Sequence, residues 1–216
     1  GTLLLQQGLP PGARVLMRLG NSPAFPVLFL AAIAVGLVPV PTSAALTGPE
    51  ITRMAAAIAP ALIVAEPGIA VPQINCPLLS GEAVLAAEGL PPWDYQMGDP
   101  ERLAYIVFTS GTSGRALPVM HAHRAIWARR MMRDGWEGLG DADRLLHAGA
   151  FNWTYTLGTG LMDPWVAGAT ALIPAAGTAA ADLPGMLARA RATIFAAAPG
   201  VFRQMLRARV PALPDL

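Results

Sequence analysis

The sequence predicts an α/β fold: a mostly parallel sheet with helices on both faces. Short apolar runs alternate along the chain with longer segments that carry helix signals, which is typical of such sheets. The runs are almost continuously apolar, as expected for parallel strands covered on both faces. Hydrophobic residues make up 54% of the chain and charged residues only 13%, which is enough apolar material for a large core.

The chain up to residue 65 has signals for three strands separated by two helices. The first helix should begin after Asn21-Ser22-Pro23, which offers capping side chains and an early proline, and should end at Gly36. The second helix should begin at Thr47, because Glu50 completes the capping-box spacing, and should stop before Pro60. The apolar runs that we interpret as strands are 14–19, 37–40 and 61–65.

The segment 66–100 is rich in Pro and Gly and is weakly periodic, so we expect a loop region with one short helix near 82–87. Alternation resumes after Pro100. The expected strands there are 104–108, 144–148, 169–173 and 193–197. The expected helices are 121–136, 157–166, 184–190 and 199–209.

A membrane segment is the alternative for the apolar stretch from Pro23 to Pro41, which has no charged residue. A spanning helix needs about 20 apolar residues. The cleanest run, 27–40, is shorter and contains Gly36 and Pro39. A buried helix that leads into a buried strand explains the stretch better, and the start of the chain does not resemble a signal peptide.

Charge and cysteine content exclude several classes of function. The formal net charge is +1, which gives no electrostatic case for nucleic acid or an anionic membrane surface as a partner. The single cysteine, Cys76, excludes an internal disulfide and suits a reducing compartment, so we expect a cytoplasmic protein without stable membrane insertion. No His, Cys or acidic residues cluster at metal-ligand spacing.

The most informative stretch is Tyr105 to Gly114, in which an apolar run ends in small polar residues and glycines. Glycine permits positive φ and close approach to an anion, and consecutive backbone N–H groups form a partly positive nest. We therefore expect an exposed phosphate-binding loop between a central strand and a helix. An ordinary loop is the alternative. A P-loop and a dinucleotide fingerprint do not fit these glycines.

This stretch resembles the phosphate-binding loop of the acyl-adenylate-forming enzymes, which include acyl-CoA synthetases, adenylation domains and luciferases. The resemblance implies that the ATP phosphates contact Thr109, Ser110, Gly111, Thr112, Ser113, Gly114 and Arg115. The loop departs from the family pattern, because Leu117 stands where a lysine is expected and Pro118 where a glycine is expected. Phosphate binding should then be weaker than usual or should depend on Arg115.

Further segments resemble the same family in the expected order, namely 9–15 with 21–23, 34–41 with 47–50, 165–170, and 190–195 with 199–206. The segment Ala150 to Gly158 resembles the acyl-pocket motif of the benzoate-type CoA ligases. Flat side chains at a pocket mouth suit an apolar or aryl acyl group. The resemblance therefore implies an acyl pocket shaped by Trp153, Tyr155 and Gly158, and plain core residues are the alternative.

Histidines and arginines outside these motifs have simpler interpretations. His121 and His123 follow the loop, and capping or packing roles are favoured over phosphate contact. His147 is interpreted as a satisfied core histidine. The arginines expected on one solvated helix face are Arg129, Arg130 and Arg133.

By this resemblance, residues 1–216 form the first part of the large N-terminal domain of an adenylate-forming enzyme. We expect a βαβαβ segment over 1–65, a loop-rich connection over 66–100, and the phosphate-loop and acyl-pocket segment over 101–216. The chain has no lysine, and the family's adenine, ribose and C-terminal motifs are not found. We therefore expect a fragment that lacks the C-terminal domain, with catalytic residues unknown.

The resemblance implies that the full-length parent is an acid–CoA ligase. Such an enzyme activates a carboxylic acid with ATP and Mg²⁺ to an acyl-adenylate and then transfers the acyl group to CoA. The fragment alone should be inactive. A non-catalytic nucleotide- or acyl-binding remnant of the same fold is the alternative.

Overall fold

The structure is a computed structural model that describes residues 1–110, 116–175 and 177–208. The chain forms two compact units, Gly1–Ala125 and Ile126–Leu216, each with its own sheet. The main sheet of each unit is parallel and carries helices, so the predicted α/β class is confirmed.

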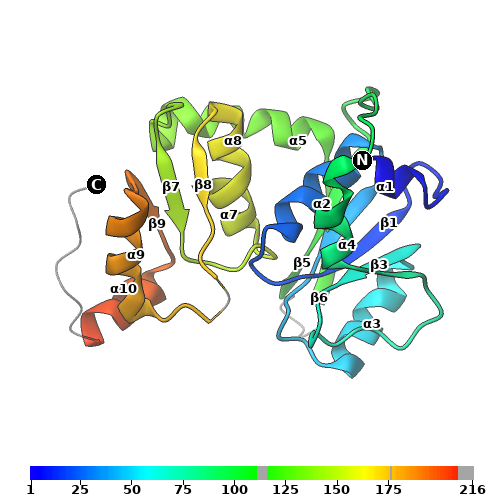
Figure 1. The fold of residues 1–216 in the computed structure, drawn as a ribbon, viewed down its shortest axis with the longest axis horizontal. Helices are drawn as coiled ribbons and strands as arrows, with labels where there is room; N and C mark the ends of the chain where they lie inside the picture. The colour runs from blue at the N-terminus through cyan, green and yellow to red at the C-terminus, as the bar shows by residue number, and fades with distance from the viewer. Residues whose placement is uncertain (111–115, 176, 209–216) are drawn as a thin grey trace. The chain divides into compact units, whose positions relative to one another are not determined.

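The sheet of the first unit has four strands in the order β2–β1–β3–β4, all parallel (Figure 1). Their bounds are β1 Arg14–Arg18, β2 Val38–Pro41, β3 Leu62–Ala65 and β4 Leu78–Ser80. The first three were predicted. The last lies in the segment expected to be a loop region, and its three residues are too few to show a period.

Helices flank this sheet. The helix α3 (Gly48–Ile58) packs its buried side chains onto the face that carries Leu16 and Ile63. The helices α2 (Ala24–Ala34) and α4 (Gly81–Ala86) lie side by side (Figure 1). A further short helix, α1, spans Thr2–Leu5, and a 3₁₀ turn, η1, spans Ala87–Gly89.

The predicted capping box at the start of α3 is confirmed. The Glu50 carboxylate accepts hydrogen bonds from the Thr47 backbone N–H at 2.8 Å and from the Thr47 hydroxyl at 2.6 Å. These bonds lower the pKa of Glu50, the hydroxyl contributing most. The sequence signal was sufficient here because both partners lie within one turn.

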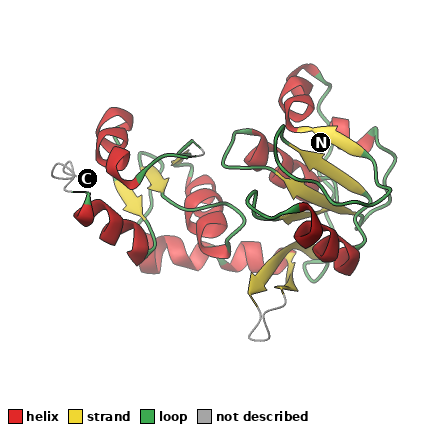
Figure 2. Cartoon of the chain, turned by 90° about the horizontal axis from the view of Figure 1, so that it is seen from below, coloured by secondary structure: helices red, strands yellow, loops and turns green. Residues whose placement is uncertain are grey.

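The β5–β6 hairpin follows the parallel sheet. The strand β5 (Leu103–Ser110) pairs antiparallel with β6 (Ala116–Ala122), and Figure 2 shows the two strands in yellow. The expectation that a helix follows the phosphate loop directly is therefore wrong. The return strand is apolar in sequence but carries Pro118, which counts against an interior strand, and in the structure most of its residues are exposed.

Helical structure begins after the hairpin, within the segment predicted as one helix. It consists of α5 (His123–Ala128), α6 (Arg130–Met132) and a π-helical turn, η2 (Arg133–Glu137).

The second unit has a three-stranded parallel sheet in the order β8–β7–β9. The strands are β7 (Arg144–His147), β8 (Thr170–Leu172) and β9 (Ile194–Ala196), close to the predicted positions. The helices α9 (Leu183–Ala190) and α10 (Pro199–Arg207) pack with Leu146 of the central strand, and a 3₁₀ turn, η4 (Ala180–Asp182), precedes α9.

A helical run between β7 and β8 replaces the predicted helix 157–166. It comprises α7 (Thr154–Leu157), a π-helical turn η3 (Gly158–Met162) and α8 (Asp163–Ala167). The run begins earlier than expected, at Thr154, so Tyr155 is helical as well. Among the described residues, no helix is long and apolar enough to cross a membrane.

Candidate functional site

Two groups of predicted site residues lie in different units. The phosphate-loop residues belong to the β5–β6 hairpin of the first unit, and the acyl-pocket residues belong to the helical run of the second.

The β5–β6 hairpin presents the start of the phosphate loop. Thr109 and Ser110 are the last residues of β5; Thr109 is exposed and pairs with Leu117 of β6. The remaining predicted contacts lie outside the described residues: Gly111, Thr112, Ser113, Gly114 and Arg115. The chain therefore enters the loop from a strand, β5, as predicted. It leaves the loop through a second strand, β6, which was not predicted.

The base of the hairpin is anchored in the core of the first unit. Ile106 belongs to the cluster formed with Leu16 and the buried side of α3. The ring of Tyr105 contacts Phe29 edge to face at 5.5 Å. This buried base gives the start of the loop a fixed support, although Thr109 at the end of β5 is exposed.

The ring of His121 has a packing role, as expected, and His123 is partly buried at the start of α5. His121 stacks on Tyr105, with ring centroids 4.5 Å apart. His123 begins α5, and its backbone N–H donates to the Arg102 carbonyl at 3.1 Å. Burial lowers the pKa of both imidazoles, and Arg102 adds to the effect at His123.

Trp153 and Tyr155 of the predicted acyl pocket are exposed. Trp153 precedes α7 and is 65% exposed, and Tyr155 within α7 is 46% exposed. The alternative that these aromatics are plain core residues does not hold. Gly158, one turn later, is buried where the helix becomes π-helical. Such π-helical turns occur frequently at functional sites.

His147 lies directly behind this aromatic surface. It ends β7, is only 2% exposed, and contacts the Tyr155 ring edge to face at 4.5 Å. Neither ring nitrogen has a hydrogen-bond partner among the described residues. Burial lowers the pKa of His147 to about 4, so the ring is neutral near pH 7. His147 is a core histidine as predicted, but the prediction that it is satisfied is wrong.

A partly buried ion pair holds the acyl-pocket helix. The Arg129 Nε donates to Asp163 Oδ1 at 2.9 Å, and a second bond joins Nη2 to Oδ2. Asp163 is 3% exposed. The prediction that Arg129 is a solvated residue is therefore wrong, because its partner lies 34 positions away in the sequence. The sequence signal that could have identified Asp163 is that it is an acidic residue isolated in an apolar segment.

Gly158 is required by this ion pair. A Cβ at Gly158 would lie 2.2 Å from Arg129 Cζ, so the guanidinium occupies the space above the glycine. Gly158 thus leaves room for Arg129 to reach Asp163, a structural role that was not predicted.

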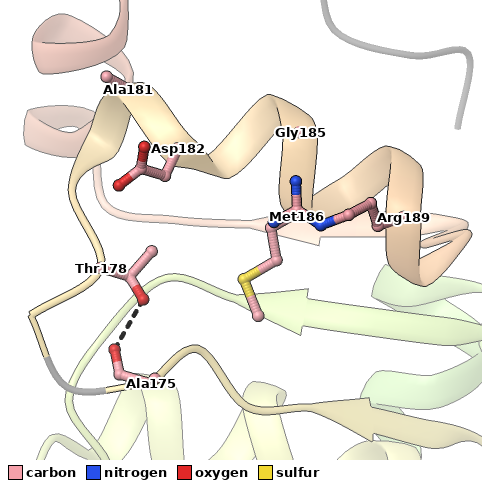
Figure 3. Close-up of a pocket in the computed structure, with 7 residues that line it drawn as sticks. All are labelled: Ala175, Thr178, Ala181, Asp182, Gly185, Met186 and Arg189. Atoms are coloured by element: carbon pink, nitrogen blue, oxygen red, sulfur yellow. Dashed lines mark hydrogen bonds between the residues drawn. The ribbon is translucent and has the colours of Figure 1, made fainter.

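A separate hollow in the second unit lies beside α9, and Figure 3 shows its lining. Its volume is about 580 Å³. Asp182 and Arg189 lie apart along the helix with Met186 between them. None of the predicted site residues lines this hollow, so we do not assign the site to it.

Comparisons with known proteins give a consistent result. Residues 1–215 match the family model described as AMP-binding enzyme. The chain is 29% identical over 187 residues to anthranilate–CoA ligase of Pseudomonas aeruginosa, covering 76% of the chain and 35% of the relative. It is 27% identical over 237 residues to 4-hydroxybenzoate–CoA/benzoate–CoA ligase of Rhodopseudomonas palustris, covering 100% and 44%.

Among solved structures, a benzoate CoA ligase from Burkholderia xenovorans matches with a TM-score of 0.86 at 23% identity, covering 98% of the chain and 44% of that protein. The chain therefore spans less than half the length of these relatives and has the fold of the N-terminal domain of adenylate-forming CoA ligases. Because the family model covers nearly the whole chain, this protein belongs to the AMP-binding enzyme family.

Proposed function

We propose that the chain is the phosphate-binding and acyl-binding part of an AMP-forming ligase that joins an aryl carboxylic acid to CoA. The observation that carries the proposal is the hairpin. An anchored strand delivers Thr109 and Ser110 to a run of glycines and hydroxyl residues, in a chain that matches the AMP-binding family over residues 1–215. The exposed Trp153 and Tyr155 and the names of the aryl-CoA ligase relatives favour an aryl acid.

The reaction has two steps. A carboxylate oxygen of the acid attacks the α-phosphorus of ATP, and the bond to pyrophosphate breaks, giving an acyl-adenylate. The CoA sulfur then attacks the acyl carbon, and AMP leaves. The loop from Thr109 to Arg115 would hold the β- and γ-phosphates, since preorganised donors stabilise developing charge. Trp153 and Tyr155 would orient the aryl ring.

The structure supports ATP more directly than Mg²⁺. Hydroxyl and backbone donors at the end of β5 suit phosphate oxygens. Among the described residues, no group of three or more His, Cys, Asp or Glu side chains could hold a metal ion. Mg²⁺ would then be bound largely by the nucleotide phosphates, and none of the residue roles proposed above depends on it.

ATP–pyrophosphate exchange with the whole gene product tests this function. We expect exchange to depend on an aryl acid, followed by release of AMP when CoA is added. Exchange with alkyl acids alone would contradict the aryl pocket. Nucleotide binding without exchange for any acid would favour the non-catalytic alternative. The 216-residue chain by itself should show no exchange, and activity of that chain would contradict the expectation that further family motifs are needed.

A further inference from the structure

His147 occupies the position in the second unit where parallel sheets bind ligands. The chain passes from the central strand β7 to β8 on one side and then to β9 on the other. In open α/β sheets, ligands bind outside the carboxyl ends of the strands at such a reversal of strand order. His147 is the last residue of β7 and therefore lies at this point.

The first unit has an equivalent position at the end of its central strand, and a side chain with partners inside the protein fills it. Arg18 is the last residue of its central strand β1 and is completely buried. The guanidinium donates to the Ala70 carbonyl at 2.7 Å, to Thr42 Oγ1 at 3.1 Å and to the carbonyls of Ser43 and Leu46. These bonds tie the loops after the strands together, so Arg18 has a structural role.

His147 differs because neither of its ring nitrogens has a hydrogen-bond partner in the part of the chain that the structure describes. A Cβ at Gly149 would lie 3.1 Å from His147 Nδ1, and a Cβ at Gly160 would lie 2.9 Å from His147 Cβ. Two glycines and the ring of Tyr155 therefore confine the imidazole. Buried polar groups without partners are rare and indicate a group that the protein itself does not supply.

The chemistry of the missing partner follows from the state of the imidazole. A neutral imidazole offers one N–H donor and one nitrogen acceptor. It suits a neutral group that can both donate and accept, such as a hydroxyl or an amino group.

Building on the proposed function, we infer that His147 is a specificity residue of the acyl pocket that hydrogen-bonds a hydroxyl or amino substituent on the ring of the aryl acid. The substituent would lie beside Tyr155, which contacts His147 and also reaches solvent. An unsubstituted ring would leave the imidazole unpaired, and sites built for a polar substituent discriminate strongly against analogues that lack it.

The test compares benzoate with its hydroxy and amino derivatives in the whole gene product. The wild-type protein should have kcat/KM for at least one derivative about tenfold or more above that for benzoate. His147→Phe keeps an aromatic ring against Tyr155. In this variant the ratio of kcat/KM for the favoured derivative to kcat/KM for benzoate should fall to within about threefold of one, with activity on benzoate still measurable. His147→Asn, which keeps a donor and an acceptor, should retain part of the preference.

The outcomes separate this inference from the proposed function. If no aryl acid supports exchange, both fail. If aryl acids are activated but the wild type shows no preference, or if His147→Phe leaves the preference unchanged, only the role of His147 is overturned. Should the variants not fold, NMR of the wild type decides. A favoured derivative must shift the His147 ring-nitrogen signals more than benzoate does, and equal shifts would overturn the inference.

Discussion

At the residue scale, Gly158 and Arg129 are interdependent. We expect Gly158→Ala to destabilise the 216-residue chain by about 2–3 kcal/mol, because the methyl group would displace the Arg129 guanidinium and leave Asp163 buried without its partner. Urea unfolding measures this loss. Gly200→Ala in α10 is the matched control, because nothing lies within 4 Å of its added Cβ and it should be nearly neutral. Equal midpoints for the two variants would contradict this account.

Two ion pairs in the chain allow burial to be tested as a variable. Asp163 is almost fully buried, whereas the side chains of Glu101 and Arg124 in the other pair are 63% and 65% exposed. We expect Asp163→Asn to cost about 2–4 kcal/mol of unfolding free energy and Glu101→Gln less than about 1 kcal/mol. Thermal and urea unfolding compare them. A cost for Glu101→Gln as large as that for Asp163→Asn would be inconsistent with the difference in burial.

His147 should make stability depend on pH. Burial holds its pKa at about 4, below the 6.5 of an unperturbed imidazole. Between these values the unfolded chain binds a proton that the folded chain does not, so stability falls as pH decreases from 6.5 to about 4. The loss should total about 3 kcal/mol. Urea unfolding across this range should show it in the wild type but not in His147→Phe. Parallel curves for the two proteins would exclude this effect.

At the scale of elements, the sequence predicted those parts that depend on local signals. The capping box of α3, the short apolar strands and the proline-initiated helices α9 and α10 were confirmed because their determinants lie within a few residues. The strand β6 was missed because it is exposed and contains Pro118.

In the candidate site, too, features set by local sequence signals were predicted and contacts between distant elements were not. Local motifs predicted a strand that leads into Thr109 and Ser110, although that strand extends through both residues, and they placed aromatic residues at the acyl segment. They did not predict the pairing of Arg129 with Asp163 or the unpaired nitrogens of His147. Both depend on contacts between elements that are distant in sequence, which no local pattern records.

The hairpin also gives a prediction about phosphate binding. Leu117 is 54% exposed and pairs with Thr109, so a longer charged side chain fits there. We expect Leu117→Lys in the whole gene product to tighten ATP binding by about tenfold, since a leucine cannot donate a charge-assisted hydrogen bond. Arg115→Ala should weaken binding if this arginine has replaced the family lysine. ATP–pyrophosphate exchange measures both. No change in either variant would show that this loop does not hold the triphosphate.

At the scale of the whole molecule, the chain exposes large apolar side chains in both units. Met120 is 73%, Trp127 69%, Met131 79% and Trp136 74% exposed. A monomeric protein rarely shows so many large apolar side chains to water unless they contact a partner or further protein. This exposure accompanies a chain that matches less than half the length of its relatives.

We therefore expect the 216-residue chain to bind the dye ANS and to self-associate. The double variant Met120→Lys/Met131→Lys should weaken dye binding and shift the protein toward monomer, because charge replaces two of the most exposed apolar groups. Dye fluorescence and light scattering measure these effects, and near-UV circular dichroism must stay unchanged so that loosened packing is not mistaken for exposed surface. A monomeric wild-type chain that does not enhance dye fluorescence would show that these side chains are not an accessible apolar surface in solution.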